Sequence, residues 1–342
     1  MGRLLLNHIY CRIEMINIVG GSGFIGSRLS TLLKRDEVEF KIVDKAMSGA
    51  FPNQTVLADV RSVEALQSAI SENAILINLA AEHRDDVRPL SLYDEVNVQG
   101  ARNLCAVARQ KGINKIIFTS TVAVYGFAPI GTDESGKIAP FNEYGQSKYA
   151  AELVFKEWQQ KDPSGRTLVI VRPTVVFGEQ NRGNVYNLLR QIASGHFVMI
   201  GRGENLKSMA YVENIAAFLK FTTSFQPGVH VYNYIDKPDF NMNKLVGLVH
   251  RILGKPGGVG LRLPYAVGFM IGKGFDLVAA ITGKRLAISS IRVKKFCTNS
   301  MFNTRIEQSG FVPPIPLVEA FERTVRHEFI ESHENESVFY TE

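Results

Sequence analysis

Gly20-Gly21-Ser22-Gly23-Phe24-Ile25-Gly26 directly follows the apolar run Met15-Ile16-Asn17-Ile18-Val19 and opens an amphipathic stretch from Ser27 to Lys34. This order predicts a strand, a tight glycine turn and a helix. Glycines at 20, 23 and 26 would let the backbone turn sharply, approach a ligand and pack the helix against the strand. The bare N–H groups at the start of the helix suit a pyrophosphate, so the turn predicts a dinucleotide site.

A second apolar run, residues 39–43, ends in Asp44, which lies about 20 residues beyond the turn. A carboxylate at this place accepts hydrogen bonds from the ribose hydroxyls of NAD and repels the 2′-phosphate of NADP. We therefore expect NAD as the cofactor, although the adjacent Lys45 carries the opposite charge.

The chain has 342 residues, enough for one large α/β domain and a smaller lobe. Its three cysteines, Cys11, Cys105 and Cys297, are scattered and form no CxxC pair. This pattern argues against a disulfide framework or a metal site and suits a reducing cytosol. Residues 1–14 precede the first predicted strand as an extension that is too polar after Leu6 for a signal peptide.

The positive charge is concentrated in one window of the chain. The net charge is +6, and residues 255–295 hold eight cations against the single anion Asp276, so this window carries +7 and the remainder −1. A local basic patch predicts a local anionic partner, such as a phosphate or a lipid headgroup. We expect no nucleic-acid partner, because the sequence contains no recognition module for one.

Apolar runs alternate with helical periodicity from Met15 to about Pro173. The runs lie at 15–19, 39–43, 74–79, 115–119 and 168–171, and the clearest helical stretches are 92–111 and 143–161. This rhythm predicts a doubly wound parallel Rossmann sheet, with ligands beyond the carboxyl ends of the strands. The predicted division is an NAD-binding domain of residues 15–173, joined again by about 211–236, a smaller C-terminal substrate-binding lobe of 174–210 and 237–330, and a tail of 331–342.

Tyr144 and Lys148 stand four residues apart in the helical stretch 143–161, so their side chains share one helix face. An ammonium beside a phenol favours the phenolate and lowers the tyrosine pKa, which makes a general base that works near neutral pH. Thr121 follows the run 115–119 at the carboxyl end of a predicted strand and could hold the oxygen that Tyr144 protonates and deprotonates. We predict that these three residues are catalytic.

Further motifs accompany the glycine turn and the Tyr144-x-x-x-Lys148 pair. They are Asp59-Val60, Leu79-Ala80-Ala81, Asn97-Val98, Ser120-Thr121-x-x-Val124-Tyr125-Gly126 and Arg172-Pro173. With them the chain resembles the extended short-chain dehydrogenase/reductases, the group of NAD-dependent sugar epimerases and dehydratases, from about Met15 to about Arg326. The resemblance implies that Asp59 and Val60 flank the adenine and that Ala80, Ala81 and Asn97 line the nicotinamide side. The implied cofactor-binding residues are Gly20, Gly23, Phe24, Ile25, Gly26, Asp44, Asp59, Val60, Leu79, Ala80, Ala81, Asn97, Tyr144, Lys148 and Pro173.

Four longer stretches resemble a narrower group within this family. They are residues 81–87, 181–186, 207–212 and 292–297. Their sequences are similar to those of bacterial 4-epimerases that act on N-acetylglucosamine linked through diphosphate to undecaprenol and that serve O-antigen and lipopolysaccharide synthesis. The resemblance implies an isomerase that inverts C4 through a 4-keto intermediate.

The same resemblance suggests residues that contact the substrate. Lys207 and Arg292 match basic positions and are the candidates for the diphosphate, while Arg182 and Asn184 are weaker candidates. His83 follows a strand end and is expected to face the cleft. Thr121 would bind O4, and the small Ser300 would leave room for an N-acetyl group. The expected substrate-binding residues are His83, Thr121, Asn184, Lys207 and Arg292.

Three other functions stay open. A soluble UDP-N-acetylglucosamine 4-epimerase and an NAD(P)H-dependent reductase of UDP-4-keto sugars share the general motifs. A sensing or scaffolding protein that kept the fold without catalysis is disfavoured by the intact Thr121, Tyr144 and Lys148.

Residues 264–283 are apolar apart from Lys273 and Asp276 and are long enough to span a membrane. The charges and the glycines argue against a span. The stretch is then either a helix packed within the second lobe or a monotopic segment beside the basic cluster, resting on an anionic leaflet. The second interpretation places the protein in the cytoplasm, peripheral on the cytoplasmic face of the inner membrane. A homodimer through 92–111 and 143–161 is expected from the family resemblance.

Overall fold

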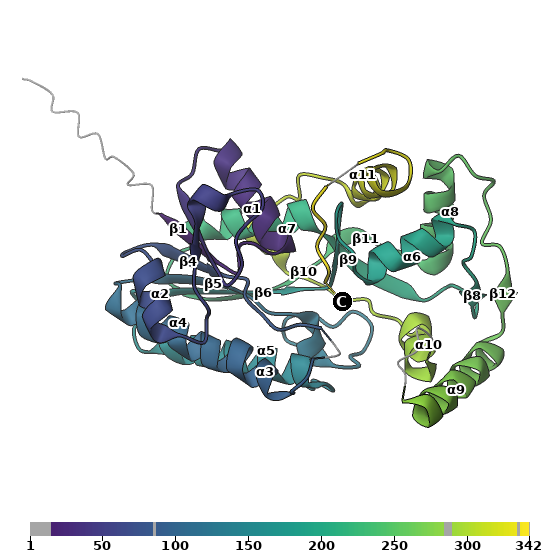
Figure 1. Ribbon diagram of the computed structural model, residues 1–342, viewed down its shortest axis with the longest axis horizontal. Helices are drawn as coiled ribbons and strands as arrows, with labels where there is room; N and C mark the ends of the chain where they lie inside the picture. Colours follow the sequence, from purple (N-terminus) through teal and green to yellow (C-terminus); the bar gives the residue numbers. More distant parts are fainter. Residues whose placement is uncertain (1–14, 85–86, 284–288, 334–335, 342) are drawn as a thin grey trace, which may run out of the picture.

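A seven-stranded parallel sheet forms the centre of the computed structural model, which describes residues 15–84, 87–283, 289–333 and 336–341 (Figure 1). The strand order is β10-β6-β5-β4-β1-β2-β3. The bounds are β1 Ile16–Val19, β2 Phe40–Asp44, β3 Thr55–Leu57, β4 Ile75–Asn78, β5 Lys115–Thr119, β6 Thr167–Pro173 and β10 Gly228–Tyr234. The central strands are apolar and buried on both faces, as strands covered by helices on either side must be. The predicted doubly wound parallel sheet is confirmed.

Helices cover both faces of this sheet. On one face α1 (Phe24–Arg35) packs against α7 (Val212–Phe221). On the other face α4 (Gly100–Gln110) lies between α2 (Val63–Ala69) and α5 (Glu143–Gln160). Each face has its own apolar cluster, so the sheet separates two cores, and its edge at the carboxyl ends of the strands stays free for a ligand.

The predicted helix at 92–111 is divided. It comprises the short α3 (Ser91–Tyr93), the π-helical turn η2 (Asp94–Gln99) and α4. Asn97 in the π-helical turn accepts a hydrogen bond from Glu82 N–H at 2.8 Å and donates to Glu82 O at 2.9 Å and Ser147 Oγ at 2.9 Å. The wider turn thus places an amide that joins the end of β4 to α5, which fits the use of π turns at functional sites.

The second lobe holds a three-stranded sheet of order β11-β9-β7 and a two-stranded sheet of β12 and β8. Its strands are β7 Val175–Phe177, β8 Met199–Ile200, β9 Leu206–Tyr211, β11 Asp236–Asn241 and β12 Arg262–Leu263. Its helices are α6 Asn184–Ala193, α8 Met242–Ile252, α9 Tyr265–Thr282, α10 Ser290–Cys297 and α11 Leu317–Phe329.

Short 3₁₀ turns occur in both parts of the described chain. They are η1 Pro52–Gln54, η3 Val122–Tyr125, η4 Thr222–Ser224 and η5 Ile306–Ser309.

Helix α9 lies at the end of the lobe that is remote from the seven-stranded sheet (Figure 1). Only Gly268 and Gly272 of α9 are buried. The predicted alternative of a helix packed within the lobe is therefore wrong for most of its surface. Within the described chain, α9 is the one helix that is long and apolar enough to cross a membrane, by length and composition only.

Alanine at position 26 should destabilise the protein and empty the dinucleotide site. A Cβ there would lie 2.5 Å from the Cα and O atoms of Gly21, and backbone cannot yield as a side chain does. We expect a loss of about 2–3 kcal/mol of stability. Thermal unfolding measures the loss of stability. The absorbance of the adenine ring in the purified protein measures how much dinucleotide is bound.

Gly247→Ala is the matched control, because a Cβ at that position in α8 meets open space. It should stabilise the protein by about 0.5–1 kcal/mol through the better helix propensity of alanine. A Gly26→Ala protein that unfolds at the wild-type temperature and keeps its dinucleotide would contradict the close approach.

Candidate active site

The glycine turn brings α1 onto β1 and β4 without room for side chains. Gly20 has a φ of +77°, and a Cβ there would lie 2.5 Å from Ala80 N. Gly23 is the N-cap of α1 and supplies no side chain to its N–H groups. The first N–H groups of α1, including those of Phe24 and Ile25, are thus left to a ligand with negative charge.

Asp44 ends β2 beside this turn. Its Oδ2 accepts a hydrogen bond from Ser22 N at 2.9 Å, and its Oδ1 accepts from Ala46 N at 3.0 Å. Each oxygen keeps a lone pair for a hydroxyl of the adenosine ribose. The glycine-rich turn, the start of α1 without a side-chain cap and this carboxylate fit NAD, which they would hold by its pyrophosphate and ribose.

The other expected NAD contacts follow the strand ends. Asp59 forms an ion pair with Arg61 at 2.7 Å, and hydrogen bonds from Arg61 lower the pKa of the Asp59 carboxyl. The buried Val60 follows it and accepts from Asn103 Nδ2 at 2.9 Å through its carbonyl. Leu79, Ala80 and Ala81 follow β4, Asn97 lies in η2, and the buried Pro173 ends β6.

Thr121 and Tyr144 lie on two elements that approach closely. Thr121 follows β5, and its Oγ1 accepts a hydrogen bond from Ala123 N at 3.1 Å, which leaves its O–H free to donate. Tyr144 lies in the first turn of α5, where the Asn142 cap accepts from Gly145 N at 3.0 Å. A Cβ at Gly145 would lie 2.8 Å from Ala123 O, so this glycine lets α5 begin directly against the turn that follows Thr121.

Lys148 lies one helical turn beyond Tyr144 and is buried, with 2% of its surface exposed. Its Nζ lies 4.3 Å from the centre of the Phe118 ring on β5. Burial lowers the pKa of Lys148 to about 7, and the charge of Glu152 opposes that shift. An anion beside this amine would favour its ammonium form, and by reciprocity the ammonium would favour a phenolate at Tyr144.

A buried polar network lies next to Thr121 and Lys148 in the sequence and connects the elements that contain them. Ser120 Oγ donates to Glu152 Oε1 at 2.6 Å, and Arg172 binds both oxygens of Glu152, at 2.8 and 2.6 Å. Arg172 also donates to the Tyr125 hydroxyl at 2.7 Å, which donates to Asn233 Oδ1 at 2.8 Å. The network joins the ends of β5, β6 and β10 to α5.

The sequence did not predict the role of Glu152. Its position four residues after Lys148 on one helix face was the available signal. Tyr125 and Arg172 are residues of the quoted motifs. The contacts of Arg172 with Glu152 and with Tyr125 depend on tertiary packing, because these residues lie 20 and 47 positions apart in the sequence.

The candidates for the diphosphate lie around α10. Lys207 Nζ on β9 donates to Lys295 O at 3.0 Å and Thr298 O at 2.7 Å, so it holds the last turn of α10. Burial lowers the pKa of Lys207 to about 8. Arg292 is exposed on α10. Ser300 pairs with β9 beside Lys207.

The remaining substrate candidates are separated. His83 is exposed after β4, and the protein atoms packed around its ring lower the pKa of its imidazole. Asn184 is the exposed first residue of α6. Arg182 points toward α11, where it forms an ion pair with the buried Glu328 side chain at 2.8 Å. Arg84, beside His83, lies 3.7 Å from Glu82, and Asp85 and Asp86 of the stretch 81–87 lie outside the described residues.

An aromatic pair marks the contact between the two lobes. The exposed Phe127 and Phe141, before α5, stack with ring centres 4.7 Å apart. Lys294 and Lys295 of α10 place their Nζ atoms 5.5 Å from the Phe127 and Phe141 rings, respectively. Helix α10 therefore reaches from the second lobe to the segment that leads into Tyr144. Lys284 and Arg285 of the predicted basic cluster lie outside the described residues.

Comparison with known proteins gives a consistent family. Residues 16–233 match the model of the NAD dependent epimerase/dehydratase family. The chain is 48% identical over 333 residues to N-acetyl-alpha-D-glucosaminyl-diphospho-ditrans,octacis-undecaprenol 4-epimerase of Escherichia coli O157:H7, covering 96% of this chain and 99% of that protein. It is 27% identical to UDP-glucose 4-epimerase of Vibrio cholerae, covering 92% and 95% of the two chains.

Solved structures share the fold at lower identity. UDP-glucose 4-epimerase of Thermus thermophilus in complex with NAD superposes with a TM-score of 0.69 at 21% identity, covering 92% of this chain and 98% of that one. UDP-N-acetylglucosamine 4-epimerase of Methanobrevibacter ruminantium gives a TM-score of 0.71 at 22% identity, with coverage of 92% and 97%.

Replacing Lys148 by methionine should stabilise the protein at neutral pH while it removes activity. Between pH 7 and the ordinary lysine pKa of 10.5, the unfolded chain binds a proton at this residue that the folded chain does not. Wild-type stability therefore gains from a rise in pH across that window. The methionine variant lacks this dependence, so its advantage in melting temperature should be largest near pH 7 and vanish near pH 10.5.

Melting curves of both proteins across this pH range, with an assay of sugar epimerisation, test the prediction. Lys161→Met, at the exposed C-cap of the same helix, controls for the removal of a lysine. An advantage of Lys148→Met that is independent of pH would show that burial does not perturb this amine.

Proposed function

Since this chain belongs to the NAD dependent epimerase/dehydratase family, we propose that it interconverts N-acetylglucosamine and N-acetylgalactosamine carried on undecaprenyl diphosphate, for O-antigen synthesis. The observation that carries the proposal is the similarity to the Escherichia coli enzyme along 96% of the chain. Thr121, after β5, and Tyr144 and Lys148, on α5, supply the catalytic groups that such a reaction needs.

The proposed chemistry begins with Tyr144. As a phenolate favoured by Lys148, it removes the proton of the 4-hydroxyl, and Thr121 donates a hydrogen bond to O4 as C4 becomes a carbonyl. NAD⁺, when bound, supplies the hydride acceptor for C4 and later the hydride donor. Tyr144 returns the proton to O4 after the ring has presented its opposite face. The reaction has no net redox change, so the cofactor can stay bound.

Inversion requires a firm hold on the diphosphate and a loose hold on the sugar. Arg292 on α10 offers a guanidinium for the diphosphate. Lys207 supports that helix through two carbonyls and keeps a third N–H for an anion. His83 and Asn184 are proposed to contact the sugar at the cleft rim. Ser300, beside Lys207, leaves space for the N-acetyl group.

We further propose that α9 lies in the cytoplasmic face of the membrane. Met270, Leu277 and Ile281 share one face of the helix and are 73%, 63% and 76% exposed. Gly268 and Gly272, on the opposite side, let α9 pack against Ile200 and Ser290. Asp276 accepts a hydrogen bond from Ser290 Oγ at 2.5 Å, so this carboxylate binds the first residue of α10. An apolar face beside the cations of α10 suits anionic lipid.

The alternatives differ in substrate or in cofactor balance. A UDP-N-acetylglucosamine 4-epimerase would act on the soluble nucleotide sugar, the substrate named for the Methanobrevibacter neighbour. A 4-keto-sugar reductase would consume one reduced cofactor per turnover. Pairing of two copies through α4 and α5 is proposed as well, and the mass of the protein in solution tests it.

Deuterium at C4 of the lipid-linked N-acetylglucosamine should stay at C4 of the epimerised product when no cofactor is added. Tyr144→Phe should lower the rate by about 10³-fold, because it removes the proton acceptor. Tyr149→Phe, on the same helix, controls for loss of a hydroxyl. Mass spectrometry of the released sugars, with UDP-N-acetylglucosamine offered in parallel, decides among the candidates. Loss of the label to solvent, or preference for the nucleotide sugar, would contradict the proposal.

Serine at positions 270, 277 and 281 together should abolish flotation of the protein with vesicles of anionic phospholipid, since about 0.8 kcal/mol is lost for each buried CH₂. Serine at the exposed positions 312, 318 and 330 is the control, because these residues lie outside α9. Equal flotation of both triple variants would exclude α9 as the membrane contact.

A further inference from the structure

The C-terminal segment of residues 336–341 lies between the substrate lobe and the coenzyme turn. In Figure 1 it descends from the end of α11 past β9 toward the centre of the molecule. We propose that this segment is a strap that retains NAD in the site, with Phe339 as its central residue. The proposal rests on the NAD dependence of the family and not on the identity of the sugar.

The strap is paired with the loop that follows β7. Phe339 N donates to Gln180 O at 2.8 Å, and Arg182 N donates to Phe339 O at 2.8 Å, so the strap and the loop form a parallel β-bridge. Thr341 Oγ1 donates to Asn181 Oδ1 at 2.7 Å. These three hydrogen bonds fix the backbone of the strap at Phe339 against the loop.

Phe339 contacts the coenzyme turn directly. Its ring centre lies 5.7 Å from that of Phe24, the first residue of α1, whose N–H is one of the donors left for the pyrophosphate. Further along the strap, Ser337 Oγ lies 3.8 Å from the position of a Cβ at Gly49, in the segment that follows the ribose carboxylate Asp44. The strap therefore contacts the coenzyme turn through Phe339 and lies near the segment that follows Asp44.

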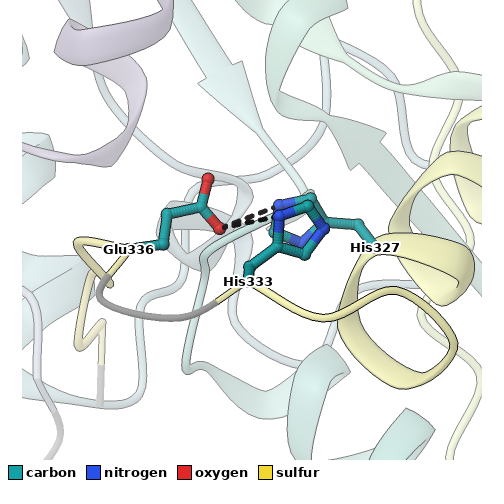
Figure 2. A group of neighbouring side chains, drawn as sticks. All are labelled: His327, His333 and Glu336. Carbon is teal, nitrogen blue, oxygen red and sulfur yellow. Dashed lines mark ion pairs between the residues drawn. The ribbon is translucent and has the colours of Figure 1, made fainter.

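The start of the strap is fastened to α11. Figure 2 shows that the stacked imidazoles of His327 and His333, with ring centres 3.9 Å apart, face the Glu336 carboxylate. His327 Nε2 lies 3.0 Å from Glu336 Oε2, and His333 Nδ1 lies 3.9 Å from it. Outer carboxylates lie beside the other ring nitrogens, Glu328 at 3.5 Å from His327 and Glu331 at 3.3 Å from His333.

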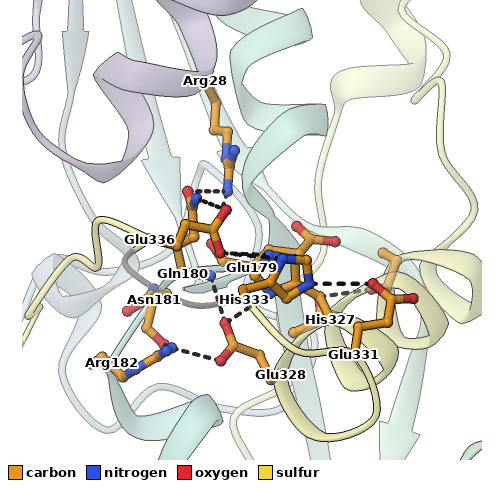
Figure 3. A network of polar contacts seen from close by, with 12 residues as sticks. Arg28, Glu179, Gln180, Asn181, Arg182, His327, Glu328, Glu331, His333 and Glu336 are labelled. Carbon is orange, nitrogen blue, oxygen red and sulfur yellow. Dashed lines mark hydrogen bonds and ion pairs between the residues drawn. The ribbon is translucent and has the colours of Figure 1, made fainter. Parts of the chain in front are cut away.

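Gln180 connects Glu336 of the strap to α1. Its side-chain amide donates to Glu336 and accepts from Arg28 Nη2 at 2.9 Å, and its N–H donates to Glu328 Oε1 at 2.6 Å (Figure 3). Gln180 has a φ of +68°, an uncommon conformation for a residue with a side chain. Such a conformation persists where its surroundings determine it, as the contacts with α1, α11 and the strap do here.

The strap joins α1 to the loop after β7 through Phe339, which contacts Phe24 and pairs with Gln180 and Arg182. In the proposal this connection holds the start of α1 in place over the pyrophosphate and so slows the release of NAD. An epimerase benefits from such a device, because a hydride removed from the sugar must return from the same coenzyme molecule. Phe339 acts through Phe24 and is a positioning residue.

The experiment measures the release of NAD from the loaded full-length protein in the absence of sugar. The loaded protein is diluted into buffer that contains a dehydrogenase and its alcohol substrate, which reduces free NAD⁺, and the rate of appearance of reduced coenzyme is recorded. Phe339→Ala should release NAD about tenfold faster, the change that loss of an ordinary aromatic pair produces. Tyr340→Ala is the matched control, because this neighbouring ring is 75% exposed.

A second readout separates retention from mere folding. The activity that Phe339→Ala loses on dilution should return when NAD is added. If this variant does not fold, Glu336→Gln replaces it. Glu336→Gln removes the carboxylate that lies against His327 and His333 and should speed release by about threefold. Release at the wild-type rate in the variants, or a dilution loss that NAD does not reverse, would overturn the strap. A wild-type protein that retains NAD but does not epimerise the sugar, together with faster release from the variants, would count against the proposed function alone.

Discussion

The active edge of the sheet depends on the buried ion pair between Glu152 and Arg172. The two side chains are 0% and 3% exposed and are joined by two hydrogen bonds. Removing one partner of such a pair costs about 3–5 kcal/mol, because the other charge stays buried without compensation. The pair also binds Ser120 and Tyr125, so it fixes α5 relative to the ends of β5, β6 and β10. The network thereby positions the turn that follows Thr121 relative to the first turn of α5, which contains Tyr144.

The same helix contains a group whose burial is unfavourable for stability and useful for catalysis. Lys148 is enclosed against Phe118, and its pKa falls to about 7. A charged amine in this environment gains most when an anion forms beside it, which is what deprotonation of Tyr144 supplies. Glu152, one turn further along, limits the shift. Stability and reactivity are thus linked through one helix face with the order Tyr144, Lys148, Glu152.

The second lobe places its charges where the two lobes meet. Helix α10 is held at its last turn by Lys207 and at its start by Asp276 of α9, and it lies against the Phe127–Phe141 pair. A substrate with a diphosphate between a polar sugar and an apolar chain would match this arrangement, with cations between a polar cleft and the apolar surface of α9. At the other side of the coenzyme site, the strap around Phe339 joins the lobes.

The sequence by itself determined the parallel sheet, the dinucleotide turn and the three catalytic candidates. These features depend on local spacing, namely glycines at 20, 23 and 26, a carboxylate at 44, and Tyr144 four residues before Lys148. Only the tertiary structure decided the π-helical turn at Asn97, the partners of Glu152 and Arg182, and the packing of Phe339 on Phe24. Those contacts join residues that are between 15 and more than 300 positions apart, and which distant strands and loops become neighbours is set by the packing of the whole chain, not by any local pattern.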